Sequence, residues 1–176
     1  HRDLHYPLRR QRQMCIRDRA GRDPERFARI VLESLAISGQ RGILATGWGG
    51  MTVMEIPENV FMIDSAPHGW LFPHMSAVVH HGGAGTTAEG LRAGVPTLVV
   101  PFIVDQLFWG NRIQELGVGL QPIQAKTLTA KNLSEAIRLL SNNSEIIQRS
   151  AAVGKIIRAE DGIGNAVNTI KQYFGG

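Results

Sequence analysis

Hydrophobic and polar positions along the chain follow two periods, one typical of short buried strands and one typical of helices. Short apolar runs, as expected for strands in a core, lie at residues 42–46, 60–63, 77–80, 97–100 and 119–122. Apolar residues at helical spacing lie at residues 24–38, 70–75, 86–93, 105–116, 129–140, 144–158 and 165–174. Gly39, Gly94 and Gly117 follow three of these stripes and are typical helix stops.

Strands that alternate with helices predict an α/β fold, in which a parallel sheet is covered by helices on both faces. Connections between such strands are right-handed. Ligands of these folds bind at the carboxyl ends of the strands. We therefore expect one domain whose site is formed by the segments that directly follow strands.

Composition and charge narrow the classes of function. The chain has 176 residues and is 43% hydrophobic, which suits one domain with its own core. Its net charge of +4 belongs to the N-terminal segment, because residues 1–29 hold nine arginines against four acidic residues and the remainder carries −1. This distribution does not predict nucleic-acid binding by the folded part. No stretch resembles a membrane span, and the single cysteine, Cys15, cannot form an internal disulfide, so we expect a cytoplasmic protein.

Residues 1–21 form a basic segment that shows neither helical nor strand periodicity. Residues 14–19 resemble a translated sequencing adapter of the kind that contaminates environmental assemblies. We therefore expect residues 1–21 to be a disordered or artefactual leader that replaces a genuine strand, and residues 22–176 to form the ordered domain. Order should begin near Pro24, since proline is favoured at the first position of a helix.

The stretch from His80 to Glu89 carries the strongest functional signal. It reads HHGGAGTTAE and joins the apolar run at residues 77–79 to a helical segment. Glycines let backbone N–H groups approach a ligand closely, and a helix N-terminus favours negative charge, so the stretch predicts a phosphate site. A second polar group, Asp105 with Gln106, follows the next apolar run and should lie at the same edge of the sheet.

The same residues could instead belong to a dinucleotide-binding site or to a metal site. Residues 83–88 match the dinucleotide-binding pattern G-x-G-x-x-A, and Asp105 lies at a distance suited to a ribose-binding acid. At least two strands precede the motif, however, whereas it usually opens the first unit of the fold. A metal site is not expected, because the spacing of the histidines fits none of the common metal sites. These histidines are His68, His74, His80 and His81. Neighbouring strand residues point to opposite faces, so His81 should face the cleft and His80 should pack behind it.

Three ordered motifs resemble the donor-binding signature of family 1 glycosyltransferases. They are HHGGAGTT at residues 80–87, GVP at residues 94–96 and PFIVDQ at residues 101–106. The bacterial and fungal sterol and natural-product glucosyltransferases are the most similar group, and residues 45–50 and 64–73 extend the resemblance. Members of the family have two facing Rossmann-like domains, the GT-B arrangement, and the C-terminal domain binds the nucleotide sugar. The resemblance therefore implies that this chain is the C-terminal, donor-binding half.

The resemblance assigns a role to each matching residue by its position. The donor diphosphate would be bound by a histidine and the helix start after it, namely His81, Gly83, Gly85, Thr86 and Thr87. Glu89 would accept hydrogen bonds from the ribose, although an acid in the first helical turn is also explained by the helix dipole. Pro67 and His68 would contact the base. Asp105 and Gln106 would bind the sugar.

Two positions depart from the plant members of the family. Ser65 replaces their base-stacking tryptophan, so Trp48 or Trp70 would have to cover the base. Ala84 and Gly85 replace a Trp-Asn pair, which removes a side-chain amide from the phosphate site.

The implied reaction is the transfer, with inversion, of a hexose from a UDP-sugar to a hydroxyl of a lipophilic acceptor such as a sterol, a lipid or a polyketide. The general base of the family belongs to the N-terminal domain, so no catalytic residue is expected in this chain, and no cofactor. The expected partners are the UDP-sugar, the small-molecule acceptor and the N-terminal acceptor domain of the full-length protein. Two alternatives stay open: an NAD(P)-binding fragment of an oxidoreductase, and a non-catalytic nucleotide-binding module.

Overall fold

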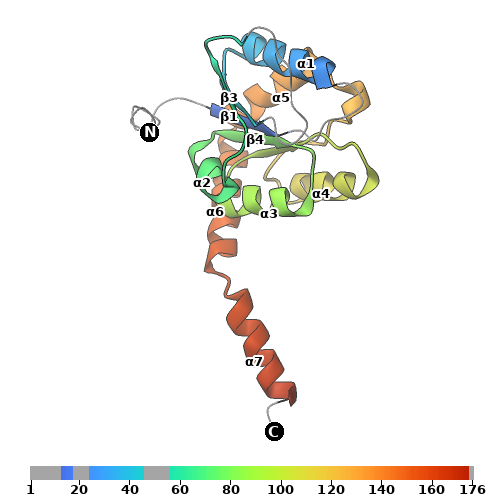
Figure 1. Ribbon diagram of the computed structural model, residues 1–176. Coiled ribbons are helices and arrows are strands. Elements are labelled where there is room, and N and C mark those ends of the chain that lie inside the picture. Colours follow the sequence, from blue (N-terminus) through green and yellow to red (C-terminus); the bar gives the residue numbers. More distant parts are fainter. Residues whose placement is uncertain (1–12, 18–23, 46–55, 175–176) are drawn as a thin grey trace.

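The computed structural model describes residues 13–17, 24–45 and 56–174, and Figure 1 shows its ribbon. Five strands form one parallel sheet, namely β1 (Gln13–Arg17), β2 (Arg41–Ala45), β3 (Val60–Ile63), β4 (Ala77–His80) and β5 (Thr97–Val99). Their order across the sheet is β3-β2-β1-β4-β5. The predicted α/β fold with a parallel sheet is confirmed, and β3 and β4 have the predicted bounds.

Strand β1 lies in the middle of the sheet and corrects one prediction. We expected no regular structure in residues 1–21, yet Gln13–Arg17 pairs in parallel with β2 on one side and β4 on the other. The sequence of this strand has no alternating hydrophobic pattern. The strand forms because its backbone pairs with a neighbour on each side. Residues 1–12 and 18–21 lie outside the described residues, so the origin of the leader and the domain boundary at residue 21 stay predictions.

The prediction of a strand at residues 119–122 is wrong. The chain runs beside β5 here, with the N–H of Thr97 donating to the carbonyl of Val118 at 3.1 Å and one parallel bridge between Thr97 and Gly119. Pro122 has no N–H to donate to a ladder. The N–H of Ile123 donates instead to the carbonyl of Val99 at 3.1 Å, so the segment follows β5 without forming a regular strand.

The helices lie at the predicted places, with small shifts at their starts. They are α1 (Pro24–Ser38), α2 (His68–Leu71), α3 (Ala84–Ala93), α4 (Val104–Glu115), α5 (Ala130–Asn142), α6 (Ser144–Ala159) and α7 (Gly162–Phe174), with the short 3-10 helices η4 (Phe72–His74) and η5 (Ala125–Thr127). Helix α3 begins at Ala84, two residues before the predicted start at Thr86. The glycine loop is therefore shortened to residues 81–83, and the glycine and threonines after it belong to the helix.

Helices cover both faces of the sheet, as predicted. On one face, α1 and α5 pack together, and Leu35 and Ile137 join Val79 of β4 in one buried cluster. On the other face, Phe72 and Val78 belong to a second cluster under α2 and α3. The neighbours Val78 and Val79 thus point to opposite faces, which is the alternation of a pleated strand.

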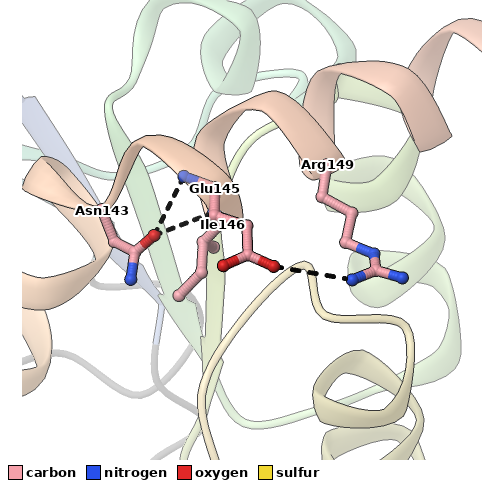
Figure 2. Close-up of polar contacts among 4 residues, drawn as sticks. All are labelled: Asn143, Glu145, Ile146 and Arg149. Atoms are coloured by element: carbon pink, nitrogen blue, oxygen red, sulfur yellow. Dashed lines mark hydrogen bonds and ion pairs between the residues drawn. The ribbon is translucent and has the colours of Figure 1, made fainter.

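Helix α6 begins with a side-chain cap, which Figure 2 shows. Asn143 Oδ1 accepts hydrogen bonds from the N–H groups of Glu145 at 3.0 Å and Ile146 at 3.1 Å, and so satisfies two donors that the helix leaves free. Glu145 also pairs with Arg149 one turn later, at 3.9 Å. Helix α6 packs against α3, and α7 then extends away from the body of the molecule with no buried residue (Figure 1). Within the described residues, no helix is long and apolar enough to cross a membrane.

Candidate functional site

The order of the described strands reverses between β1 and β4. Strands β2 and β3 follow β1 on one side, whereas β4 and β5 lie on its other side. Ligands of open α/β sheets bind outside the carboxyl ends of the strands at such a switch point. Residues 81–83 follow β4 directly, so the glycine loop and the start of α3 lie at this point.

The N-terminus of α3 presents free backbone donors at the switch point. Its N-cap, Gly83, supplies no side-chain hydrogen bond, and its first turn holds no acidic residue. The N–H of Thr87 donates to the carbonyl of Gly83 at 2.9 Å and forms the first bond of the helix. The N–H groups of Ala84, Gly85 and Thr86 therefore have no acceptor within the helix. Together with the positive end of the helix dipole, they favour an anion.

His81 folds over this helix start. A Cβ on Gly83 would lie 2.7 Å from His81 Nε2, so the half-buried ring sits directly against a residue that has no side chain. Gly85 is exposed, and no atom lies within 4 Å of the place a Cβ would take. The structure therefore brings His81, Gly83 and Gly85 to one surface and leaves open space beside the free N–H groups.

The two threonines of the motif turn inward. Thr86 is 8% exposed and Thr87 is 1% exposed. The N–H of Thr86 has no acceptor among the described residues, whereas the N–H of Thr87 donates to the carbonyl of Gly83. The Thr87 hydroxyl is enclosed and has no partner in the described part of the chain. Thr87 therefore presents no exposed donor in this structure, and its role at the diphosphate stays a prediction.

His80 and His81 have different surroundings, as the alternation of strand residues predicted. His80 is 1% exposed, and its Nδ1 accepts a hydrogen bond from the N–H of Gly82 at 2.9 Å. Burial, and to a smaller extent the neighbouring His81 and His68, lowers the pKa of His80 from 6.5 to about 3. The ring of His80 is therefore neutral at physiological pH.

Gly82 is a structural residue of the loop that the sequence prediction did not single out. Its φ of +90° lies in the region that favours glycine. A Cβ here would also lie 2.6 Å from Val99 Cγ1 and 2.8 Å from the carbonyl oxygen of Gln106. Glycine thus lets the loop pack directly against β5 and α4. The available signal was a glycine placed just after a strand.

The residues predicted to contact the base and the ribose lie side by side. Pro67 is exposed and precedes α2, and His68 stacks on Phe72 with ring centroids 4.6 Å apart. The next residue, Gly69, faces α3, because a Cβ on it would lie 3.3 Å from Glu89 Oε2. The start of α2 therefore meets the one acidic side chain of α3.

Glu89 is not a first-turn acid. Because α3 begins at Ala84, Glu89 is the sixth helical residue, and the explanation of Glu89 by the helix dipole is wrong. Its Oε1 lies 3.9 Å from Arg92 Nε. The same two side chains line a pocket of about 360 Å³ between α2 and α3, together with Gly69 and Arg158.

Asp105 and Gln106 begin α4 beside the loop, but they present different groups. Asp105 is the second residue of the helix and is exposed. Gln106 is 7% exposed, and its Oε1 accepts hydrogen bonds from the N–H groups of Phe102 at 2.7 Å and Ile103 at 3.2 Å. The carbonyl oxygen of the side chain is thus engaged in shaping the chain between β5 and α4, and the amide nitrogen is the group left for a ligand.

Trp48 and Trp70 are the two candidates to cover the base. Trp48 lies outside the described residues. Trp70 is 50% exposed and packs edge-on against His74, with ring centroids 5.4 Å apart. The described residues contain no group of three or more His, Cys, Asp or Glu placed to hold a metal ion.

Comparison with known proteins shows the family. The family model described as "Erythromycin biosynthesis protein CIII-like, C-terminal domain" matches residues 42–161, which is more than half of the chain. The chain belongs to this family. The predicted resemblance to family 1 glycosyltransferases is therefore confirmed for the part of the chain that carries the glycine loop and residues 101–106.

Relatives and solved structures agree with this EryCIII-like assignment. A sterol 3-beta-glucosyltransferase from Arabidopsis thaliana is 48% identical over 154 residues, which cover 86% of this chain and 25% of the relative. The calicheamicin glycosyltransferase has a TM-score of 0.79 at 24% identity, with 94% of this chain and 42% of that chain covered. The UDP-glucose: anthocyanidin 3-O-glucosyltransferase, solved in complex with UDP, has a TM-score of 0.72 at 20% identity, with 85% and 36% covered.

These likenesses show that the EryCIII-like chain has the fold of one half of a GT-B glycosyltransferase, and that it spans about a quarter of the length of the plant relative. The dinucleotide alternative is not favoured. Besides the family match, Asp105 lies in the first turn of α4, whereas a ribose-binding acid of that motif would directly end β5.

Proposed function

We propose that this chain is the donor-binding domain of a UDP-sugar-dependent glycosyltransferase. One observation carries the proposal: two pairs of the segments that we expect to bind the donor are in contact at the carboxyl edge of the sheet. Gly82 of the glycine loop packs against Gln106 at the start of α4, and Gly69 at the start of α2 packs against Glu89 of α3. A ligand of three parts, in the order base and ribose, diphosphate, sugar, fits this arrangement.

The diphosphate would lie at the N-terminus of α3. The N–H groups of Gly85 and Thr86 have no acceptor within the helix, and the His81 ring beside Gly83 adds a side-chain donor. Hydrogen bonds from such donors to a charged oxygen are stronger than those between neutral groups. The same donors would stabilise the nucleoside diphosphate as it leaves, which is where negative charge develops in sugar transfer.

The other subsites flank the diphosphate. Glu89 would accept hydrogen bonds from the ribose hydroxyls, and Pro67 and His68 would contact the base. Asp105 would accept from the sugar hydroxyls, and the amide nitrogen of Gln106 would donate to them. Asp105 is exposed at the helix start, where a ligand can reach it.

The names of similar proteins support the substrate class. The Arabidopsis relative is a sterol 3-beta-glucosyltransferase, and the anthocyanidin enzyme was solved with UDP. We infer that the full-length protein transfers a hexose, with inversion, from a UDP-sugar to a hydroxyl of a lipophilic acceptor such as a sterol, a lipid or a polyketide. A cytoplasmic location stays a prediction.

The transfer also needs a general base at the acceptor hydroxyl. We assign no residue of this chain to that role and place the base in an N-terminal acceptor domain of the full-length protein, since the chain spans 25% of the plant relative. The isolated chain should bind the donor without turning it over.

Calorimetric titration of the chain with UDP, UDP-glucose and NAD tests the donor site. We expect both uridine ligands to bind and NAD not to bind. His81→Ala should weaken UDP binding about tenfold, which corresponds to one lost hydrogen bond to a charged group. Lys171→Ala is the control, because Lys171 lies on α7, away from the body of the molecule. Binding of NAD without a response to UDP would overturn the proposal.

Coexpression with the missing N-terminal domain tests the enzymatic part of the proposal. We expect the reassembled protein to transfer glucose from UDP-glucose to a sterol. Binding of UDP without any transfer in that protein would instead indicate a non-catalytic nucleotide-binding module.

A further inference from the structure

His80 lies directly behind the proposed diphosphate site but cannot contact a ligand. It ends β4 and is 1% exposed, with its ring centroid 6.4 Å from that of His81 and the two rings nearly perpendicular. It points to the same face of the sheet as Val78, the face that α2 and α3 cover. Any effect of His80 on a ligand must therefore act through its neighbours.

The hydrogen bond from the Gly82 N–H to His80 Nδ1, at 2.9 Å, closes a two-residue turn at the end of the strand. Gly82 has a φ of +90°, and Val99 and Gln106 leave no room for a Cβ at this position. The next residue, Gly83, is the N-cap of α3. The turn thus decides the direction in which the chain leaves β4 and enters the helix.

The same hydrogen bond also fixes which nitrogen of the neutral His80 ring carries the proton. A nitrogen that accepts a hydrogen bond cannot carry a proton, so the proton of the neutral ring is on Nε2. Nε2 is enclosed and has no partner in the described part of the chain. The low pKa of His80, about 3, agrees with a ring that stays a neutral acceptor at physiological pH.

We propose that His80 is a positioning residue for the donor diphosphate: by accepting the Gly82 N–H, it holds the turn that aims the free N–H groups of α3 and the His81 ring at the ligand. The proposal rests on the proposed function, because it names what the turn is for. It goes beyond that function by assigning a task to a buried side chain that touches no ligand.

Two substitutions separate the acceptor from the bulk of the side chain. In His80→Asn, Oδ1 is bonded to Cγ as Nδ1 is in histidine, so it can accept the same hydrogen bond. His80→Leu fills the site with an apolar side chain and leaves the Gly82 N–H without its acceptor. The matched control is Val78→Ala, a truncation of a residue that is 1% exposed on the same face of β4 and has no bond to the loop. It should cost stability without changing the turn.

The experiment measures the UDP dissociation constant of each variant by calorimetry at a temperature where near-ultraviolet circular dichroism shows it folded. We expect His80→Leu to weaken UDP binding at least tenfold, about the effect of one lost interaction, and to speed hydrogen exchange at the Gly82 amide. His80→Asn should bind UDP within about threefold of the unsubstituted chain, and Val78→Ala should match it.

Tight UDP binding by folded His80→Leu would overturn the proposal, and so would an equal loss in Val78→Ala, which would indicate a general effect of stability. Loss of binding in His80→Asn with unchanged Gly82 exchange would also overturn it. If the unsubstituted chain does not bind UDP, the proposed function fails and the positioning role fails with it. The exchange rate of the Gly82 amide, measured without ligand, shows separately whether the hydrogen bond exists.

Discussion

At the scale of residues, two adjacent histidines at the end of β4 have separate tasks because their surroundings differ. His80 is enclosed and neutral, and its nitrogen accepts from the backbone of Gly82. His81 is half-buried and lies over Gly83, where an anion could reach it. One step along an extended chain reverses the direction of a side chain, so a group that shapes the loop and a group that can contact the ligand are neighbours in sequence.

The pKa of His80 makes the stability of the fold depend on pH. The unfolded chain takes up a proton on this histidine near pH 6.5, whereas the folded chain does so near pH 3, because burial and then His81 and His68 disfavour the charge. Between pH 6.5 and about pH 3, the unfolded state binds more protons than the folded state. The free energy of unfolding therefore rises with pH in this range and falls as the pH is lowered. We expect the free energy of unfolding to decrease by up to about 1.4 kcal/mol per pH unit relative to His80→Asn.

Urea unfolding of the two proteins at pH 7, 5.5 and 4.5 measures this difference. The carboxylates that titrate in the same range are common to both proteins and cancel in the comparison. Parallel pH profiles would show that His80 is not the group responsible.

Substitution of Asp105 should affect binding of the sugar part of the donor but not of the nucleotide part. It is exposed at the start of α4, while the neighbouring Gln106 is engaged with the backbone of Phe102 and Ile103. Asp105→Ala should weaken UDP-glucose binding about tenfold and leave UDP binding unchanged, because only the sugar hydroxyls would meet the carboxylate. Titration with both ligands checks this. Equal losses for UDP and UDP-glucose would contradict the assignment of Asp105 to the sugar.

At the scale of elements, periodicity predicted most of the fold because most helices bury one face. In α5, Leu133 and Ile137 are fully buried, and Thr129 caps the helix by accepting from the N–H of Asn132 at 3.2 Å. These contacts follow from residue types at fixed spacings. Strand β1 could not be predicted in this way, because its residues, QMCIR, show no alternation and its pairing with β2 and β4 is a tertiary effect.

The motifs predicted which segments of the candidate site lie near one another, but not which of their atoms are available to a ligand. The glycine loop contacts the start of α4, and the start of α2 contacts α3, as expected of segments that follow strands of one parallel sheet. The binding roles of these residues stay predictions. A sequence motif does not show which of its side-chain atoms are buried or already hydrogen-bonded within the protein. The Oε1 of Gln106 is bonded to its own loop, and Thr87 is enclosed because α3 starts two residues earlier than its glycine and threonines suggested.

The start of α6 offers a prediction about a single element. Asn143 supplies two hydrogen bonds to the helix N-terminus, whereas the Glu145–Arg149 pair is exposed (Figure 2). Asn143→Ala should lower the free energy of unfolding by about 1 kcal/mol. Glu145→Gln should change it by less than about 0.5 kcal/mol, since exposed ion pairs contribute little. Urea unfolding of both variants makes the comparison, and a larger effect of Glu145→Gln would reverse this ranking of cap and ion pair.

At the scale of the whole molecule, the last two helices differ in how they are held. Helix α6 packs against α3, where Ser150 is 2% exposed and its hydroxyl donates to the carbonyl of Val118 at 3.2 Å. Helix α7 has no buried residue, and Ile163, Ile170 and Phe174 are 82%, 58% and 84% exposed. The stability of the described body should therefore depend on α6 and not on α7.

Removal of residues 161–176 tests this difference. Because α7 buries nothing, the truncated chain should keep its free energy of unfolding within about 0.5 kcal/mol, which corresponds to a shift in Tm of roughly 2 °C. Its UDP dissociation constant should also be unchanged. Removal of residues 144–176 is the contrasting variant, and it should unfold at a much lower temperature because α3 then loses the helix that covers it. Differential scanning calorimetry measures both, and a drop of several degrees on loss of α7 alone would mean that α7 packs on the body of the molecule in solution.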